Sequence, residues 1–189
     1  MNKPEKLLNL LGSVALNKDM IEECLSLINS KLLLRNVIGD IHIFWGAAML
    51  LLFNSRISTK DIDTIFSPVQ IFREVIQEVE AELGLHKSWL NDAVKGFVSG
   101  YSNELLYRQY ANLRIYIPHP EYLLAMKLLS ARTDTEDIGD IRLLIKSLKL
   151  KSADDIYNIL KKYYSSDKIL IKTQYVIGDI LKEMELNND

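Results

Sequence analysis

The chain has 189 residues, of which 48% are apolar and 25% are charged, and its formal net charge is −2. A chain of this length and composition folds as a globular protein without disulfides or a structural metal. The single cysteine, Cys24, excludes an internal disulfide and a cysteine-based zinc site. The near-neutral charge argues against a protein that coats nucleic-acid phosphates with basic side chains, although a small local basic cleft is compatible with it.

The sequence shows neither a targeting pattern nor a membrane-spanning pattern. Residues 1–6 do not read as the start of a signal peptide. No apolar run approaches the roughly 20 residues that a membrane span needs. We therefore expect a cytoplasmic protein that makes no membrane contact.

The first half of the chain predicts helices and short strands. Its expected elements are a helix over 19–34, a strand over 40–45, a short buried helix over 47–53, a strand over 59–66 and a helix over 68–83. Asp19 is a plausible N-cap of the first helix, and Cys24 lies on its apolar side. Glu74, Glu78 and Glu82 share one face of the last helix, a spacing typical of a solvated surface.

The second half predicts one more strand and then only helices. Residues 89–92 form a less regular segment, and 113–117 predict a third strand that Pro118 and Pro120 end. Helices are expected from Pro120 to about 128 and over 137–148, 152–163 and 168–185. The chain therefore predicts an α+β fold, with a small mixed sheet flanked by helices over 1–118 and a helical bundle over 119–189 packed on that core.

Asp61 and Asp63 are the most informative residues, because one residue separates them on an expected strand. Strand side chains alternate between faces, so both carboxylates point to the same side while Ile62 points into the protein. A divalent cation relieves the repulsion between them, and Mg²⁺ is bound by one or two carboxylates together with substrate phosphates and water. The same pattern near a strand end is often only a solvated turn, so its neighbours decide the interpretation.

Those neighbours form a series of motifs in fixed order. The motifs are Gly46-Ala47, a spacer of thirteen residues, Asp61-Ile62-Asp63, Trp89-Leu90-Asn91-Asp92, residues 120–129 and residues 137–144. Together they resemble the AbiEii-like branch of the DNA polymerase β-type nucleotidyltransferases, and the matches cover most of residues 38–145. Members of that branch resemble toxins of type IV abortive-infection systems and toxins that add nucleotides to the 3′ end of transfer RNA.

The resemblance implies a nucleotidyltransferase-type sheet and a Mg²⁺-dependent reaction. In that reaction a nucleoside triphosphate gives its nucleoside monophosphate to a hydroxyl of RNA, such as the 3′ end of a transfer RNA, or of a protein. It also implies a toxin that is paired with a cognate antitoxin.

The nucleotide-binding roles follow from the same resemblance. Gly46 and Ala47 would form a strand-to-helix turn whose backbone N–H groups approach the triphosphate, because the side chains there are minimal. Arg56 and Thr59 fall where the family approaches its aspartates. Ala47 departs from the family's Gly or Ser and lacks a hydroxyl for phosphate, although its backbone N–H is kept.

The catalytic roles concern five residues. By resemblance, Asp61 and Asp63 would be the Mg²⁺ ligands, and Lys127 would contact phosphate as a point charge. Asp137 and Asp140 match an Asp-x-x-Asp motif and share one helix face, since they are three positions apart. The third strand carries no carboxylate, so the role of base falls to Asp137 or Asp140, or is missing.

Ordinary roles stay open for three of these residues. Lys127 could lie on the outer face of an apolar helix, Asp140 could pair with Arg132 or Arg142, and Asp137 could cap its helix. Two other classes of protein also stay open. One is a catalytically degenerate domain of the same fold that binds a nucleotide or a protein, and the other is a structural helical adaptor.

Overall fold

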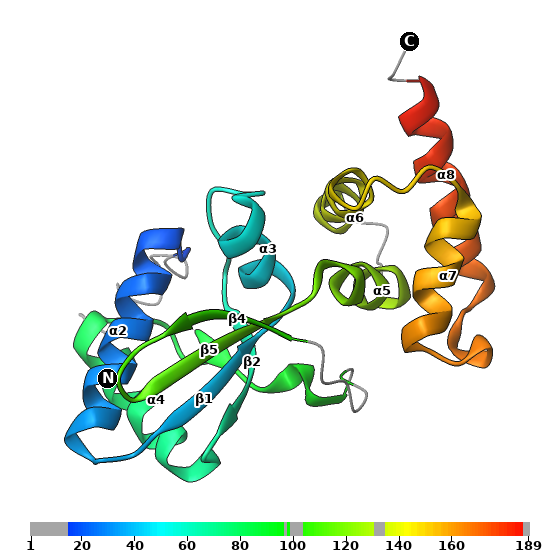
Figure 1. Ribbon diagram of the computed structural model, residues 1–189. Helices are drawn as coiled ribbons and strands as arrows, with labels where there is room; N and C mark the ends of the chain where they lie inside the picture. The colour runs from blue at the N-terminus through cyan, green and yellow to red at the C-terminus, as the bar shows by residue number, and fades with distance from the viewer. Residues whose placement is uncertain (1–14, 97, 99–103, 131–134, 187–189) are drawn as a thin grey trace, which may run out of the picture. The chain divides into compact units, whose positions relative to one another are not determined.

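A computed structural model describes residues 15–96, 98, 104–130 and 135–186. The described residues form two compact units. The first contains the described residues up to Val98 together with Glu104–Ile117, and the second contains those from Pro118 onward. Strands occur in the first unit, whereas the second is helical (Figure 1).

A mixed sheet forms the centre of the first unit. Among the described residues it has five strands in the order β3-β2-β1-β5-β4. The strands are β1 (Gly39–Ile43), β2 (Ile62–Ser67), β3 (Leu90–Asn91), β4 (Glu104–Gln109) and β5 (Leu113–Pro118). β1 runs antiparallel to β2 and parallel to β5, and β2 runs parallel to β3. The expected α+β class and the three expected strands are confirmed.

Two parts of the sheet differ from the sequence prediction. β2 begins at Ile62, later than expected, because Thr59 instead forms an isolated bridge with Leu16. In this bridge Leu16 N–H donates to the Thr59 carbonyl at 2.7 Å, and Thr59 N–H donates to the Leu16 carbonyl at 2.9 Å. The sequence also did not predict β4, which is an outer strand with Leu105 and Leu106 largely exposed, so it lacks a regular apolar alternation.

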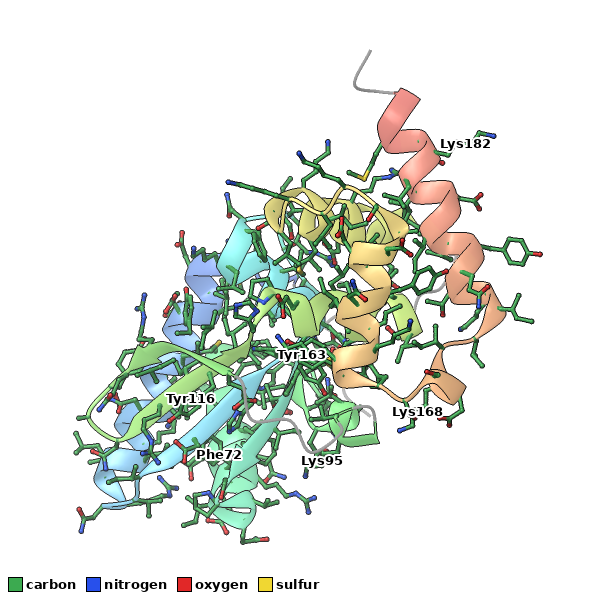
Figure 2. The ribbon with its side chains drawn as sticks, turned by 45° about the vertical axis from the view of Figure 1, so that its right-hand side comes forward. Phe72, Lys95, Tyr116, Tyr163, Lys168 and Lys182 are labelled. Atoms are coloured by element: carbon green, nitrogen blue, oxygen red, sulfur yellow. The ribbon has the colours of Figure 1, made fainter. Side chains whose placement is uncertain are left out.

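Helices cover the apolar face of this sheet. Side chains along β1 and β2 alternate between buried and half-buried, and the buried set faces α2 (Lys18–Leu34) and α4 (Val69–Leu83). At Gly39 a Cβ would lie 2.5 Å from the ring of Phe72 and 3.0 Å from Leu32, so the strand approaches these helices where only glycine fits. Phe72 projects from α4 in Figure 2.

The start of α2 corrects one expectation. Asn17, not Asp19, is the N-cap, and its side chain accepts a hydrogen bond from Met20 N–H at 2.9 Å. Asp19 instead lies in the first turn, where its negative charge favours the helix dipole. Cys24 is buried as expected, and burial raises the pKa of its thiol to about 12, so it is a packed side chain at neutral pH.

The glutamate face of α4 is more than a solvated surface. Glu82 accepts a hydrogen bond from Lys31 of α2 at 2.7 Å, and Glu78 pairs with Arg35, the C-cap residue of α2. The Glu82 carboxylate also raises the pKa of Lys31. These two carboxylates therefore link α4 to α2, although all three glutamates of the expected stripe are exposed.

The second unit contains four α-helices among the described residues. They are α5 (Pro120–Ser130), α6 (Thr135–Ser147), α7 (Ala153–Tyr163) and α8 (Ile171–Leu186), with a short 3₁₀ turn over Ser166–Lys168. α5 packs against α6, α7 and α8, which explains why its side chains are buried from Tyr122 through Leu128. The expected helices are confirmed. In the described part of the chain, no helix combines the length and apolar character needed to cross a bilayer.

Glu121, at the start of α5, connects that helix to the end of α7. Its carboxylate accepts hydrogen bonds from Lys162 Nζ at 2.6 Å and from the Tyr163 hydroxyl at 3.0 Å. The Lys162 ammonium makes the largest contribution to lowering the pKa of Glu121 below its ordinary value of 4.5. The ionised carboxylate is thus favoured in the folded protein.

This contact predicts an acid-dependent stability. A carboxyl whose pKa is lower in the folded state stabilises fully above its unfolded pKa and loses that effect as the pH falls through its folded pKa. We expect Glu121→Gln to lower the free energy of unfolding by about 0.5–1 kcal/mol at neutral pH, the range for partly exposed ion pairs. Urea denaturation should show that the difference in free energy of unfolding between wild type and variant shrinks as the pH falls below 4.5. A gap of constant size into strong acid contradicts this account.

Candidate functional site

The strand-to-helix turn after β1 is the first part of the candidate site. β1 ends at Ile43 and α3 (Trp45–Phe53) begins two residues later, so Gly46 and Ala47 lie in the first turn of that helix. Phe44 is the N-cap and makes no side-chain hydrogen bond to the turn. The first N–H groups of a helix have no partner within the helix, and together with the helix dipole they favour an anion.

The backbone of this turn is unusual at one residue. Trp45 has a φ of +47°, a left-handed conformation that costs an ordinary residue roughly 1–2 kcal/mol. Such backbone strain is found disproportionately at binding and catalytic sites. Here it bends the chain sharply between the strand and the helix, and Gly46 follows directly.

Gly46 lies against two other residues that the sequence singled out. A Cβ at Gly46 would lie 3.1 Å from Thr59 Oγ1 and 3.2 Å from Arg56 Nη1. The structure thus brings Gly46, Arg56 and Thr59 together, although Gly46 precedes the other two by ten and thirteen positions in sequence. Asn54, in a left-handed conformation, ends α3 and turns the chain back toward Gly46.

The two aspartates follow directly on this cluster. Asp61 precedes β2 and Asp63 lies within it, and both are half-buried, whereas Ile62 and Thr64 between and beyond them are fully buried. The expected alternation is therefore present. Thr59 Oγ1 donates to the Asp61 carbonyl at 3.1 Å, so the Gly46 cluster and the start of β2 are in direct contact.

A backbone hydrogen bond fixes Asp63 next to the turn. Phe44 N–H donates to the Asp63 carbonyl at 2.9 Å, which links the N-cap of α3 to β2. On the other side, Ile62 N–H donates to the Trp89 carbonyl at 2.7 Å, and the Trp89 side chain is completely buried. The described residues contain no group of three or more His, Cys, Asp and Glu side chains arranged to hold a metal ion.

A separate cluster lies in the second unit. Lys127 Nζ of α5 lies 2.8 Å from Asp137 Oδ1 and 2.8 Å from Asp140 Oδ2, both on α6. Lys127 is 3% exposed and Asp140 is 4% exposed, while the Asp137 side chain is 27% exposed. One ammonium therefore faces two carboxylates in a largely buried setting. The attraction between these ions replaces the stabilisation by water that each loses on burial.

This cluster bears on three alternatives that the sequence left open, and it decides two of them. Lys127 is buried and not on an outer helix face, and Asp140 pairs with it and not with Arg142, which pairs with Glu183 of α8. α6 begins at Thr135, so Asp137 is inside the helix and does not cap it. The remaining candidate partner, Arg132, lies outside the described residues.

The nine candidate residues thus fall into two groups. Gly46, Ala47, Arg56, Thr59, Asp61 and Asp63 belong to the first unit, and Lys127, Asp137 and Asp140 belong to the second. Within each group the contacts above bring residues distant in sequence together.

The sequence did not single out the polar side chains on the open face of the sheet. Arg114 of β5 forms a two-pronged ion pair with Asp40 of β1, at 2.6 and 2.8 Å, and His42 Nδ1 lies 2.6 Å from Glu104 Oε2. The alternation of polar residues in 40–43 could have indicated this face. The partner of His42, however, lies on β4, a strand that the sequence did not predict.

The comparison with protein families gives one match that covers most of the chain. Residues 18–176 match the family described as nucleotidyltransferase of unknown function (DUF6036). No curated protein and no solved structure matches this chain. The matched region includes both groups of candidate residues and nearly every described helix and strand. The chain therefore belongs to the DUF6036 family of nucleotidyltransferases.

Proposed function

We propose that this protein transfers a nucleoside monophosphate from a nucleoside triphosphate to a hydroxyl of an RNA, such as the 3′ end of a transfer RNA, or of a protein, in a Mg²⁺-dependent reaction. One observation carries the proposal. The Gly46 turn lies against Arg56 and Thr59, and the Thr59 hydroxyl donates to the Asp61 carbonyl. A backbone hydrogen bond from Phe44 N–H to the Asp63 carbonyl ties the turn to β2. Nucleotidyl transfer needs an anion cradle beside a pair of carboxylates, because it is catalysed mainly by positioning and by charge neutralisation.

The anion cradle would bind the phosphates of the nucleotide. The N–H groups in the first turn of α3 supply donors, and the absent side chain at Gly46 lets an oxygen approach the backbone. The guanidinium of Arg56 reaches the same point and suits a phosphate because its donors form a planar fork. Ala47 is fully buried, so the missing hydroxyl leaves the backbone N–H as the group available there.

The carboxylate pair fits the proposed metal. Asp61 and Asp63 are half-buried on one side of β2, and two hard oxygen ligands next to a phosphate cradle suit Mg²⁺, which takes one or two carboxylates and completes its shell with phosphates and water. When bound there, Mg²⁺ would neutralise charge on the phosphates and orient the attacking and leaving oxygens.

The second group of residues enters this proposal through the family resemblance. In AbiEii-like proteins the matching lysine contacts phosphate, and the Asp-x-x-Asp motif completes the site, so Lys127, Asp137 and Asp140 are proposed to take those roles. The same resemblance suggests that the protein is a toxin with a cognate antitoxin. Within the second unit, buried Lys127 forms ion pairs with both aspartates.

Label transfer tests the proposal directly. Purified protein is incubated with each α-³²P-ribonucleoside triphosphate, Mg²⁺ and either total RNA or a protein extract. Label in one acceptor fraction that disappears with Asp61→Asn/Asp63→Asn supports the proposal and names the nucleotide. Asp19→Asn is the matched control, since it removes one exposed carboxylate from the same unit. No transfer above the double variant with any acceptor contradicts it.

A degenerate binding domain is the second candidate, and the open sheet face favours it. β5 presents Arg114 and Tyr116 there and no carboxylate. A nucleotide that raises the melting temperature only with Mg²⁺, with the effect lost in Asp61→Asn, supports the enzyme. A rise that is independent of metal supports a nucleotide-binding module, and no rise with any nucleotide favours a protein-binding domain.

Gly46→Ala gives a prediction specific to the cradle. The new methyl group would press on the Arg56 guanidinium and the Thr59 hydroxyl, at 3.2 and 3.1 Å. We expect stability to change by less than about 1 kcal/mol, because alanine favours the helix and the arginine end can shift. Nucleotide affinity should fall by roughly tenfold, the equivalent of about one lost hydrogen bond. Isothermal titration checks the affinity, and an unchanged Kd contradicts the prediction.

A further inference from the structure

The open face of the sheet carries a histidine that the proposed function does not use. Residues paired across strands point to the same face, so the registers put His42 of β1 opposite Ile65 of β2 and beside Tyr116 of β5. Asp63 is two residues from Ile65 along β2 and therefore shares this face. His42 and Asp63 are thus diagonal neighbours across one strand pair, a relation that places Cα atoms roughly 7–8 Å apart.

His42 is held from two sides. Its Nδ1 lies 2.6 Å from Glu104 Oε2 of β4, and the two side chains are only 26% and 18% exposed. Its ring stacks on that of Tyr116, with centroids 4.9 Å apart and planes inclined by 16°. Tyr116 is labelled on β5 in Figure 2. The carboxylate and the aromatic face thus restrain the imidazole, and Nε2 is the ring nitrogen that does not face Glu104.

This face also carries the charged side chains of Asp40, Asp63 and Arg114. Asp40 and Arg114 pair with each other through two hydrogen bonds, which also raise the pKa of Arg114. The imidazole therefore faces a carboxylate on one side, a phenol ring on another and the apolar Ile65 across the strand. A histidine whose Nδ1 faces a carboxylate is set to accept a proton at Nε2, because the carboxylate stabilises the imidazolium that results.

We propose that His42, oriented by Glu104, accepts the proton of the hydroxyl that attacks the nucleotide. This inference rests on the proposed function, and it gives His42 the role of base in place of Asp137 or Asp140, because both of these carboxylates pair with Lys127. The hydroxyl oxygen forms a bond to the α-phosphorus while its proton moves to His42 Nε2. The bond from the α-phosphorus to the bridging oxygen breaks, and pyrophosphate leaves with that electron pair. His42 then releases the proton to solvent, and Glu104 is a positioning residue.

The test compares transfer rate and nucleotide binding in the same variants. With α-³²P-ribonucleoside triphosphate and the acceptor fraction that wild type labels, His42→Gln should lose about 10²–10⁴-fold in transfer rate at neutral pH, the usual contribution of a general base. The rise in melting temperature with nucleotide and Mg²⁺ should stay at the wild-type value. Asp40→Asn, on the same face, should keep both the transfer rate and the binding.

The pH profile separates a catalytic from a merely structural role. Wild-type transfer should rise with pH along a limb that His42→Gln lacks. Glu104→Gln should slow transfer while nucleotide binding is kept, because the imidazole loses the carboxylate beside Nδ1, and Glu104→Asp should restore part of the rate. A His42→Gln variant with the wild-type rate, or one that loses nucleotide binding along with transfer, overturns this role and leaves the proposed function standing. A wild-type protein that binds nucleotide without transferring it overturns both.

Discussion

Asp61→Asn and Asp63→Asn are each expected to slow nucleotidyl transfer by roughly 10²–10⁴-fold. Metal-assisted charge neutralisation contributes several kcal/mol to such reactions, and each 1.36 kcal/mol corresponds to a factor of ten in rate. Asparagine keeps the size of the side chain and removes its charge. Because both positions are half-buried at the edge of β2, with fully buried Ile62 between them, the fold should persist.

Single-turnover rates at saturating nucleotide measure this effect, with circular dichroism and the melting temperature as checks of folding. The loss should be partly reversed when Mn²⁺ replaces Mg²⁺, since Mn²⁺ also accepts oxygen ligands in octahedral sites. Equal rates for wild type and both variants would remove these carboxylates from the reaction. The same rates measured for Asp19→Asn should match wild type, as that carboxylate lies in the exposed first turn of α2.

The second large effect is on stability. We expect Lys127→Met to lower the free energy of unfolding by about 3–5 kcal/mol, because it removes the ammonium that pairs with buried Asp140 and half-buried Asp137. Asp140 would bear most of the cost, since its side chain is 5% exposed and Lys127 Nζ is its ion-pair partner at 2.8 Å. Urea denaturation monitored by far-UV circular dichroism measures this loss. α5 and α6 supply much of the helical signal of the second unit.

Two further variants separate charge from shape. Lys162→Met removes an ammonium that also pairs with a carboxylate, but at a side chain that is 53% exposed, so it should cost less than about 1 kcal/mol. Lys127→Met/Asp140→Leu removes both buried charges and should recover much of the loss, because a buried pair replaced by apolar groups is often close to neutral. A double variant as unstable as the single one would show that packing, and not unpaired charge, dominates.

The order of helices and strands could be predicted because it depends on local patterns. The apolar spacing in α7 and the prolines before α5 are visible in the sequence and act within a few residues. The details that failed depend on partners far along the chain. Thr59 pairs with Leu16 instead of extending β2, and exposed Glu78 makes ion pairs with Lys31 and Arg35 that the sequence did not predict. No window of neighbouring residues contains that information.

The candidate site divides in the same way. The alternation of Asp61 and Asp63 about buried Ile62 is a local property and was predicted. The contact of Gly46 with Arg56 was expected only through the family pattern. The burial of Lys127 could not be predicted, because a lysine in an apolar helix is ordinarily exposed, and its two carboxylate partners come from the next helix. The His42–Glu104 contact depended on a strand that the sequence did not reveal.

The hydrogen bond from Phe44 N–H to the Asp63 carbonyl has a consequence for how such a protein changes through mutation. It joins two main-chain groups, so the spacing between the helix start and the aspartate strand is independent of side-chain identity. Side chains at the turn and on β2 can therefore be exchanged while the scaffold that holds them keeps its dimensions. We therefore expect that single substitutions at the turn or on β2 can remove, restore or change the chemistry of the site while each sequence along the way still folds.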